Sequence, residues 1–271
     1  PYGIALILST IYFRVDSIII LFFKGEEELA IYGPAMKMIE QFSILPLYFM
    51  NSILPILSKA IHENADRYKA IIRNGFDVLA AMAFPITVGG FLLAYPLIFI
   101  IASPDFLSRL SEGFYGTDIA LQILIFALLF QFLNVLFAFV LISVDQQKKL
   151  LYINAFCVLF NVITNLIFVP EYGFRAAAIT SVLSELLILI GNYYYAKKAL
   201  DFDISFTNLF KIILSSLVMG LSIHLLQPLT YTWLQNWNVL ILTAIGATIY
   251  VTMIFATGTL NKEKIRLIMK K

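Results

Sequence analysis

Long apolar runs separated by short polar connections dominate the pattern of this chain. Eight of these runs are each long enough to cross a bilayer as a helix, which takes about 20 mostly apolar residues. The connections carry turn signals such as Ser103-Pro104-Asp105, and none is long enough to form a further domain. The sequence therefore predicts an all-α integral membrane protein with about eight transmembrane helices. These helices are expected over residues 2–23, 30–57, 76–102, 119–144, 150–169, 176–195, 209–226 and 239–257.

Composition supports the same class and argues against an enzyme. The chain is 61% hydrophobic and 13% charged, whereas a soluble domain is typically about 45–50% apolar and about 25% charged. It contains no H-E-x-x-H, G-x-S-x-G, Walker or G-x-G-x-x-G motif. We therefore expect no catalytic residues, no metal site, no cofactor and no nucleic-acid partner.

The distribution of lysine and arginine predicts the orientation in the membrane. Basic residues concentrate in the connections after the second, fourth and sixth predicted helices and in the C-terminal tail, and cytoplasmic loops carry such an excess. They are Lys59, Arg67, Lys69, Arg73, Lys148, Lys149, Lys197, Lys198, Lys211, Lys262, Lys264, Arg266, Lys270 and Lys271. The other connections hold Lys24, Arg109 and Arg175. We therefore expect the C-terminus in the cytoplasm.

Four charged residues interrupt the first two apolar runs. Arg14 and Asp16 lie in the first run, and Lys37 and Glu40 lie in the second. A charge at bilayer depth costs on the order of 2.5–3.5 kcal/mol even on insertion scales, so such residues usually face a cavity or a partner. Arg14 and Asp16 point about 200° apart on a helix, whereas Lys37 and Glu40 can pair on one face.

The segment that contains these charges resembles a known signature. Its matching residues are similar to the pattern "RvD…G…vGiYgaAyKlie" of oligosaccharide flippases, the O-antigen and polysaccharide transporters of the multidrug/oligosaccharidyl-lipid/polysaccharide exporter superfamily. The matching residues are Arg14-Val15-Asp16, Gly25-Glu26, Ile31-Tyr32-Gly33, Ala35, Lys37 and Glu40.

Two further segments carry the same resemblance in the same order. Residues 161–185, NVITNLIFVPEYGFRAAAITSVLSE, are similar to the family pattern "N…N…liP.yGi.GAA.at..SE", with Ala176 where the family often has glycine. Residues 120–124, after an Asp105-Phe106 turn, resemble the family's connection into its tenth helix. The resemblance thus covers most of the chain.

Members of this family typically have twelve to fourteen helices in two six-helix bundles, with the substrate carried between them. The resemblance therefore implies that residues 1–200 form the second bundle and that residues 201–271 form two additional helices and a basic cytoplasmic tail. The chain starts at Pro1, without an initiating methionine, at the edge of an apolar run. We accordingly expect a missing N-terminal bundle that supplies the other half of the binding site.

The resemblance also assigns roles to the polar residues, and each has a structural alternative. Arg14 and Lys37 are expected to bind the pyrophosphate of a lipid-linked sugar; an ion pair with Glu40 or a neighbouring helix would also account for them. Asn161 and Asn165, on one helix face, are candidates for a sugar-binding wall or for interhelical hydrogen bonds. The candidate ion-coupling residues are Asp16, Glu40 and Glu185. Two structural alternatives also stay open: Asp16 could balance the charge of an arginine in the missing bundle, and Glu185 could form a polar contact between two helices.

Together these expectations describe a multi-pass flippase of the cytoplasmic (inner) membrane. It would move a polyprenyl-pyrophosphate-linked oligosaccharide to the outer leaflet for cell-surface polysaccharide synthesis. Its expected partners are this lipid-linked oligosaccharide and membrane lipids, with a polysaccharide polymerase and glycosyltransferases as further candidates. The alternatives are an ion-coupled drug/cation antiporter of the same superfamily and a non-transporting membrane partner in envelope assembly.

Overall fold

The computed structural model describes the backbone of residues 2–259 and the side chains of residues 14–259. The described chain is almost wholly helical and contains no strand, so the predicted all-α membrane fold is confirmed. The basic tail predicted after residue 260 lies outside the described residues. In chain order the elements are α1 (Tyr2–Glu63), α2 (Ala65–Leu92), α3 (Ala94–Ile101), η1 (Pro104–Phe106), η2 (Leu110–Glu112), α4 (Thr117–Ser143), α5 (Gln147–Tyr172), α6 (Phe174–Ala199), α7 (Phe206–Leu234), η3 (Gln235–Trp237) and α8 (Asn238–Ala256).

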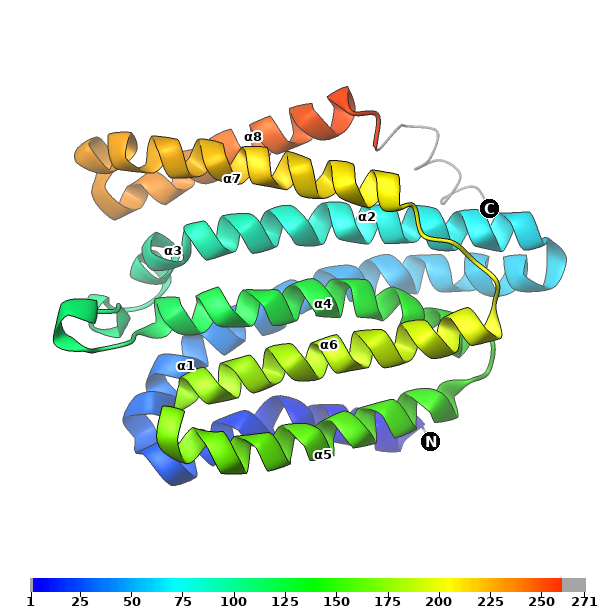
Figure 1. Cartoon of the computed structure of the whole chain (residues 1–271), viewed down its shortest axis with the longest axis horizontal. Coiled ribbons are helices and arrows are strands. Elements are labelled where there is room, and N and C mark those ends of the chain that lie inside the picture. The colour runs from blue at the N-terminus through cyan, green and yellow to red at the C-terminus, as the bar shows by residue number, and fades with distance from the viewer. Residues whose placement is uncertain (1, 260–271) are drawn as a thin grey trace.

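Six stretches of the described chain are long and apolar enough to cross a membrane. Two of them fold back on themselves. The backbone of α1 is non-helical at Gly25, which has a φ of 83°, and the stretch Phe206–Ala256 contains η3 between α7 and α8. Figure 1 shows that the chain reverses direction at both places. Seven of the eight segments predicted from the sequence therefore fall on a helix to within one residue at their ends, and the chain is a multi-pass membrane protein.

The predicted helix over residues 76–102 is in fact two helices. α2 ends at Leu92 and α3 begins at Ala94, with Leu93 between them at φ −100° and ψ 12°. Pro96 lies in the first turn of α3, where its missing N–H has no intrahelical partner to lose. A continuous helix would lack the hydrogen bond from residue 96 to the Leu92 carbonyl, because proline has no N–H to donate. A break at Leu93 therefore sacrifices fewer backbone hydrogen bonds than a break elsewhere in this segment would.

The connection between α1 and α2 is shorter than the sequence predicts. α1 continues to Glu63 and α2 starts at Ala65, which leaves Asn64 as the junction. The Asn64 side-chain oxygen accepts hydrogen bonds from the backbone N–H groups of Asp66, at 2.9 Å, and Arg67, at 3.3 Å. This is the N-cap arrangement that asparagine favours, and it starts α2 directly after α1.

α4 forms the centre of the bundle and packs against α6, α1 and α2. Its apolar residues are spread around the helix, as expected for a helix that is mostly buried or in contact with lipid. Its neighbour α6 presents Ala177 and Ala178, both with no exposed surface. Small side chains at such positions let membrane helices approach closely.

α7 and α8 form a hairpin that packs on α2 (Figure 1). The Tyr250 hydroxyl donates to the Ala81 carbonyl at 2.7 Å, and the Asn208 amide donates to the Asp77 carboxylate. These hydrogen bonds join the hairpin to α2. Directional bonds of this kind fix the position of one membrane helix on another more specifically than contacts between apolar side chains do.

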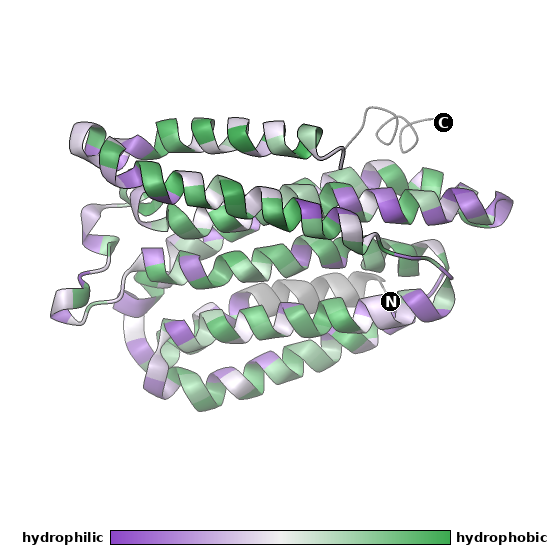
Figure 2. Cartoon of the chain, turned by 45° about the horizontal axis from the view of Figure 1, so that its top comes forward, coloured by the Kyte–Doolittle hydropathy of each residue, from purple (hydrophilic) through white to green (hydrophobic). Residues whose placement is uncertain are grey.

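The connections gather at two ends of the bundle. The start of α1 and the α1–α2, α4–α5 and α6–α7 connections lie at one end, and the Gly25 break and the α3–α4, α5–α6 and α7–α8 connections lie at the other (Figure 1). The described basic residues of the larger predicted group lie at or near the first end. Figure 2 shows hydrophobic residues along the middle of the helices and hydrophilic residues mainly at the ends. We call the end with the α1–α2, α4–α5 and α6–α7 connections the lysine-rich end, and we call the opposite end the Gly25 end.

Candidate functional site

Asp16 is the centre of a buried polar cluster inside the membrane-spanning bundle. Its side chain is 2% exposed, and its carboxylate accepts hydrogen bonds from the Tyr32 hydroxyl at 3.2 Å, the Asn165 amide at 2.6 Å and the Ser181 hydroxyl. These partners come from the second half of α1, from α5 and from α6. Asp16 precedes Gly25 by nine residues, about 13 Å of helix, and therefore lies near the middle of a hydrocarbon core about 30 Å thick.

The two predicted asparagines extend this cluster. The Asn165 amide also donates to the Asn161 side-chain oxygen at 3.1 Å, which confirms that the two lie on one face of α5. Asn161 is 1% exposed and Asn165 has no exposed surface. The Asn161 amide nitrogen and the Asn165 side-chain oxygen have no hydrogen-bond partner among the described residues. One donor and one acceptor without a described partner therefore adjoin the Asp16 carboxylate, the acidic group of the cluster.

Arg14 and Lys37 differ from Asp16 in that both are exposed on the surface of the described chain. The predicted opposition of Arg14 and Asp16 on the helix is thus confirmed. The ion pairs formed by described residues include neither Arg14 nor Lys37.

The antiparallel halves of α1 place these two cations at similar depth. The bond between Asp16 and Tyr32 sets the register, so Arg14 lies level with residue 34. Lys37 is three residues further along, about 4.5 Å of helix rise. Two positive charges that form no ion pair with a described residue therefore lie within one helical turn of each other in depth, near the middle of the membrane.

The remaining predicted residues lie in different surroundings. Glu40 is half-buried on α1, and the expected Lys37–Glu40 ion pair is not among those that the described residues form. Glu185 is 6% exposed on α6, four residues after Ser181, and therefore lies on the same buried helix face as the Asp16 cluster. The structure thus brings Asp16, Asn161 and Asn165 together, and the hydrogen bonds that join them do not include Glu40.

Sequence reasoning missed Tyr32 and Ser181 as members of the cluster. Tyr32 lies inside the signature segment, and its hydroxyl in an otherwise apolar run was the available signal, because a buried tyrosine hydroxyl usually finds a partner. Ser181 had a weaker signal, its spacing of four residues from Glu185. Neither contact is visible locally, since Ser181 is 165 positions from Asp16.

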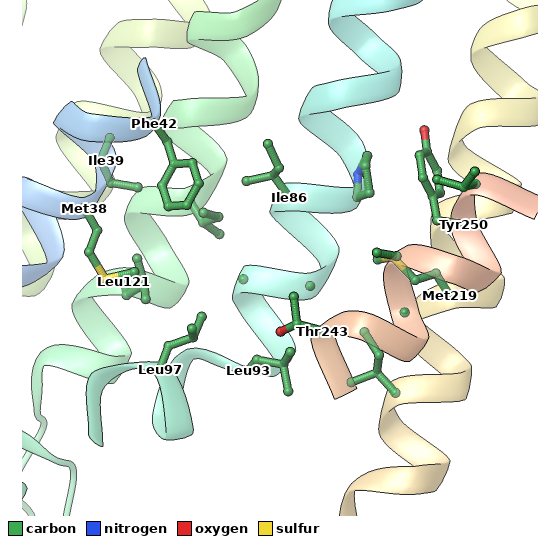
Figure 3. A pocket seen from close by; sticks show the side chains of 18 residues that line it. Met38, Ile39, Phe42, Ile86, Leu93, Leu97, Leu121, Met219, Thr243 and Tyr250 are labelled. Atoms are coloured by element: carbon green, nitrogen blue, oxygen red, sulfur yellow. The ribbon is translucent and has the colours of Figure 1, made fainter. Parts of the chain in front are cut away.

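A separate apolar cavity of about 350 Å³ lies where α1, α2, α3, α4, α7 and α8 meet. Figure 3 shows Phe42, Ile86, Leu121 and Met219 among the side chains that surround it. Thr243 and Tyr250 are the polar side chains that line it, so the cavity suits an apolar group. Within the described chain, no group of His, Cys, Asp and Glu side chains has the arrangement of a metal site.

The fold and this site define a membrane-embedded helical bundle of the kind found in transporters. The MatE family model matches residues 1–167, and the chain belongs to this family. No curated protein sequence matches it.

Two solved structures share its fold. The lipid II flippase MurJ, in an inward closed conformation, superposes with a TM-score of 0.75 at 18% identity, over 95% of this chain and 53% of that one. An outward-facing multidrug resistance MATE family transporter of the MOP superfamily superposes with a TM-score of 0.57 at 16% identity, over 98% of this chain and 64% of that one. The chain thus spans about half the length of the flippase that it resembles.

Proposed function

We propose that the protein is a flippase that moves a polyprenyl-pyrophosphate-linked oligosaccharide from the cytoplasmic to the outer leaflet of the inner membrane. The observation that carries the proposal is the pair of exposed cations Arg14 and Lys37. Both lie at membrane depth without an acidic partner among the described residues. The similarity in fold to a lipid II flippase supports the same substrate class.

The chemistry of the two cations suits a pyrophosphate. The planar guanidinium of Arg14 can donate two parallel hydrogen bonds to phosphate oxygens, and the Lys37 ammonium acts as a point charge beside it. An uncompensated charge at this depth costs on the order of 2.5–3.5 kcal/mol. A bound anionic head group would offset this cost in the loaded state.

The proposed architecture is that of an alternating-access transporter. Residues 1–200 act as one bundle, and residues 201–271 add the α7–α8 hairpin and the tail. A preceding bundle faces α1, and the substrate site lies between the two bundles. The lysine-rich end faces the cytoplasm, as the positive-inside rule predicts.

We further propose that Asp16 couples transport to an ion gradient. Its carboxylate joins both halves of α1 to α5 and α6, so a proton or cation that arrives there changes the contact between three helices. Glu185 supports this cluster from α6, and Glu40 remains a candidate coupling residue outside it. Moving one charge across the membrane is worth about 2.3 kcal/mol per 100 mV, which is enough to bias a two-state equilibrium.

The test uses the protein expressed from its complete reading frame in proteoliposomes. One arm follows a fluorescent lipid-pyrophosphate oligosaccharide between leaflets, and a second arm follows uptake of an organic cation, both with an imposed gradient. Movement of the lipid-linked oligosaccharide without cation transport supports the proposal.

A specific observation favours one alternative, an ion-coupled drug/cation antiporter. The fold is also similar to that of a multidrug resistance transporter, and the bundle contains the buried acid Asp16. Cation uptake without movement of the lipid-linked oligosaccharide would establish this alternative and overturn the flippase. Activity in neither arm would favour a non-transporting partner in envelope assembly.

A further inference from the structure

A second cavity, of about 440 Å³, lies between α4, α5 and α6 and begins near the Gly25 end. Its volume falls in the range of about 300–1,000 Å³ that is typical of ligand pockets. The described chain leaves it open at the surface, since Ile179 is 50% exposed and Leu183 is 45% exposed. It is lined by Ile123, Thr164, Phe168, Tyr172, Arg175, Ala176, Ile179, Thr180 and Leu183.

Arg175 is the charged residue of this cavity, and it lies in the first turn of α6. Its guanidinium carbon lies 4.0 Å from the centre of the Tyr115 ring. None of the ion pairs formed by described residues includes Arg175. The nearby Glu28 carboxylate instead accepts a hydrogen bond from the Phe174 N–H at 2.8 Å. A positive charge in the first turn of a helix opposes the helix dipole, so the contact with the Tyr115 ring, and not the helix dipole, favours this cation.

The geometry leaves the guanidinium ready to bind an anion. Stacking on the Tyr115 ring uses the face of the guanidinium, and the N–H donors at its edge stay available for a phosphate. Arg109, at the same end, provides a contrast. It lies over the Phe114 ring at 4.5 Å but is paired with Glu112 at 3.0 Å. Arg175 is therefore the unpaired arginine of the two.

The cavity extends from this cation toward the hydrocarbon core. Ile179 and Leu183 follow Arg175 at intervals of four residues, so they lie in a row along α6. The row covers about 12 Å from Arg175 to Leu183. A ligand that fits this arrangement has one anionic group at the membrane interface and an apolar chain directed into the bilayer.

We propose that this cavity binds an anionic glycerophospholipid of the outer leaflet, with its phosphodiester on Arg175 and one acyl chain along Ile179 and Leu183. A single guanidinium matches the single negative charge of a phosphodiester. A pyrophosphate would call for additional cations, and the described residues that line the cavity include no second one. The site lies on α4, α5 and α6, apart from Arg14 and Lys37. It does not depend on the proposed transport function, and only the assignment to the outer leaflet rests on the orientation given under Proposed function.

The test measures lipid binding to the complete protein by native mass spectrometry. Dioleoyl phosphatidylglycerol and dioleoyl phosphatidylethanolamine have the same chains and differ in head-group charge. We expect the first phosphatidylglycerol molecule to bind with a roughly fivefold lower Kd, the upper range for an exposed ion pair. Arg175→Gln should remove this difference, and Arg175→Lys should retain part of it.

Arg109→Gln is the matched control, because it removes one positive charge over an aromatic ring at the same end and should leave the preference intact. Ile179→Trp fills the cavity without changing the charge, and it should also weaken phosphatidylglycerol binding. Equal binding of the two lipids, or a preference that survives Arg175→Gln, would overturn the proposal. Displacement of phosphatidylglycerol by a lower concentration of polyprenyl pyrophosphate would overturn the assignment to a phospholipid.

Discussion

The carboxylate of Asp16 on α1 lies 2.6 Å from the amide nitrogen of Asn165 on α5, although 149 positions of sequence separate the two residues. Both side chains are buried, and the same carboxylate accepts bonds from Tyr32 and Ser181. A single ionisable group therefore holds three helices in register at the middle of the membrane.

Asn165→Ala should destabilise the folded protein by about 1.5–3 kcal/mol, the usual range for a hydrogen bond to a charged group. The substitution removes a donor to Asp16 and leaves part of a buried carboxylate unsatisfied. Thermal unfolding in detergent measures the effect. Thr248→Ala is the control, because the exposed Thr248 hydroxyl bonds only its own helix, at the Ala244 carbonyl, in the described structure. An equal loss in both variants would argue against a special role for the Asp16 contact.

Asp16→Asn should uncouple transport from the ion gradient, since an amide of nearly the same shape can neither take up a proton nor attract a cation. Translocation by this variant should therefore be the same with and without an imposed gradient, while the wild type responds to it. Glu112→Gln, a change in the exposed ion pair with Arg109 at the Gly25 end, should keep the response. A gradient response that persists in Asp16→Asn would remove Asp16 from the coupling mechanism.

Gly25→Ala and Gly33→Ala should change stability in opposite directions. Gly25 has φ 83° and ψ −171°, a region that is essentially restricted to glycine, so a Cβ there should cost about 1–3 kcal/mol. Nothing lies within 4 Å of a Cβ built at either position, so packing does not confuse the comparison. Gly33 is helical, and alanine there should stabilise by up to about 1 kcal/mol. Unfolding midpoints measure both, and equal effects would contradict the assigned turn.

The ion pair at the lysine-rich end predicts a dependence of stability on pH. The Lys69 ammonium donates a hydrogen bond to the Asp201 carboxylate at 2.7 Å, and this contact lowers the pKa of Asp201 below its ordinary value. The folded state therefore binds the proton of Asp201 more weakly than the unfolded state does. The stabilisation is present above the ordinary carboxyl pKa and is lost as the pH falls through the lowered pKa.

Asp201→Asn should accordingly lower the unfolding temperature slightly at neutral pH, and this difference from the wild type should shrink as the solution becomes acidic. The effect is small because the pair is exposed and screened by solvent. Melting curves at several pH values measure it, and they should be compared at constant salt. A difference that grows toward acidic pH would show that the pair does not act as assigned.

The sequence predicted the number and order of the crossings because about 20 apolar residues in a row leave few alternatives to a membrane helix. Helical geometry also predicted that Arg14 and Asp16 face opposite ways and that Asn161 and Asn165 share a face. The break at Leu93 was not predicted, because the apolar pattern continues through it and Pro96 marks it only weakly.

The partners of Asp16 could not be predicted from the sequence for a different reason. Spacing determines which residues share a face of one helix, but not which helix packs against that face. Ser181 and Asn165 reach Asp16 only through the packing of α5 and α6 on α1. Lys37 and Glu40 show a second limit of sequence spacing. Their spacing of three residues permits an ion pair, but it does not require one, and the ion pairs of the described residues do not include it.

The central claim is that Arg14 and Lys37 bind the anionic head group of the transported lipid. The most direct test compares translocation of a labelled lipid-pyrophosphate oligosaccharide by the wild type, Arg14→Ala, Lys37→Ala and the control Lys148→Ala. All are full-length proteins at matched levels in proteoliposomes. Lys148 is an exposed residue of the lysine-rich end, so its removal changes the net charge equally. The account predicts strong loss in the first two variants, by at least about tenfold for a charged hydrogen bond, and retention in the control. Translocation that survives both substitutions would contradict it.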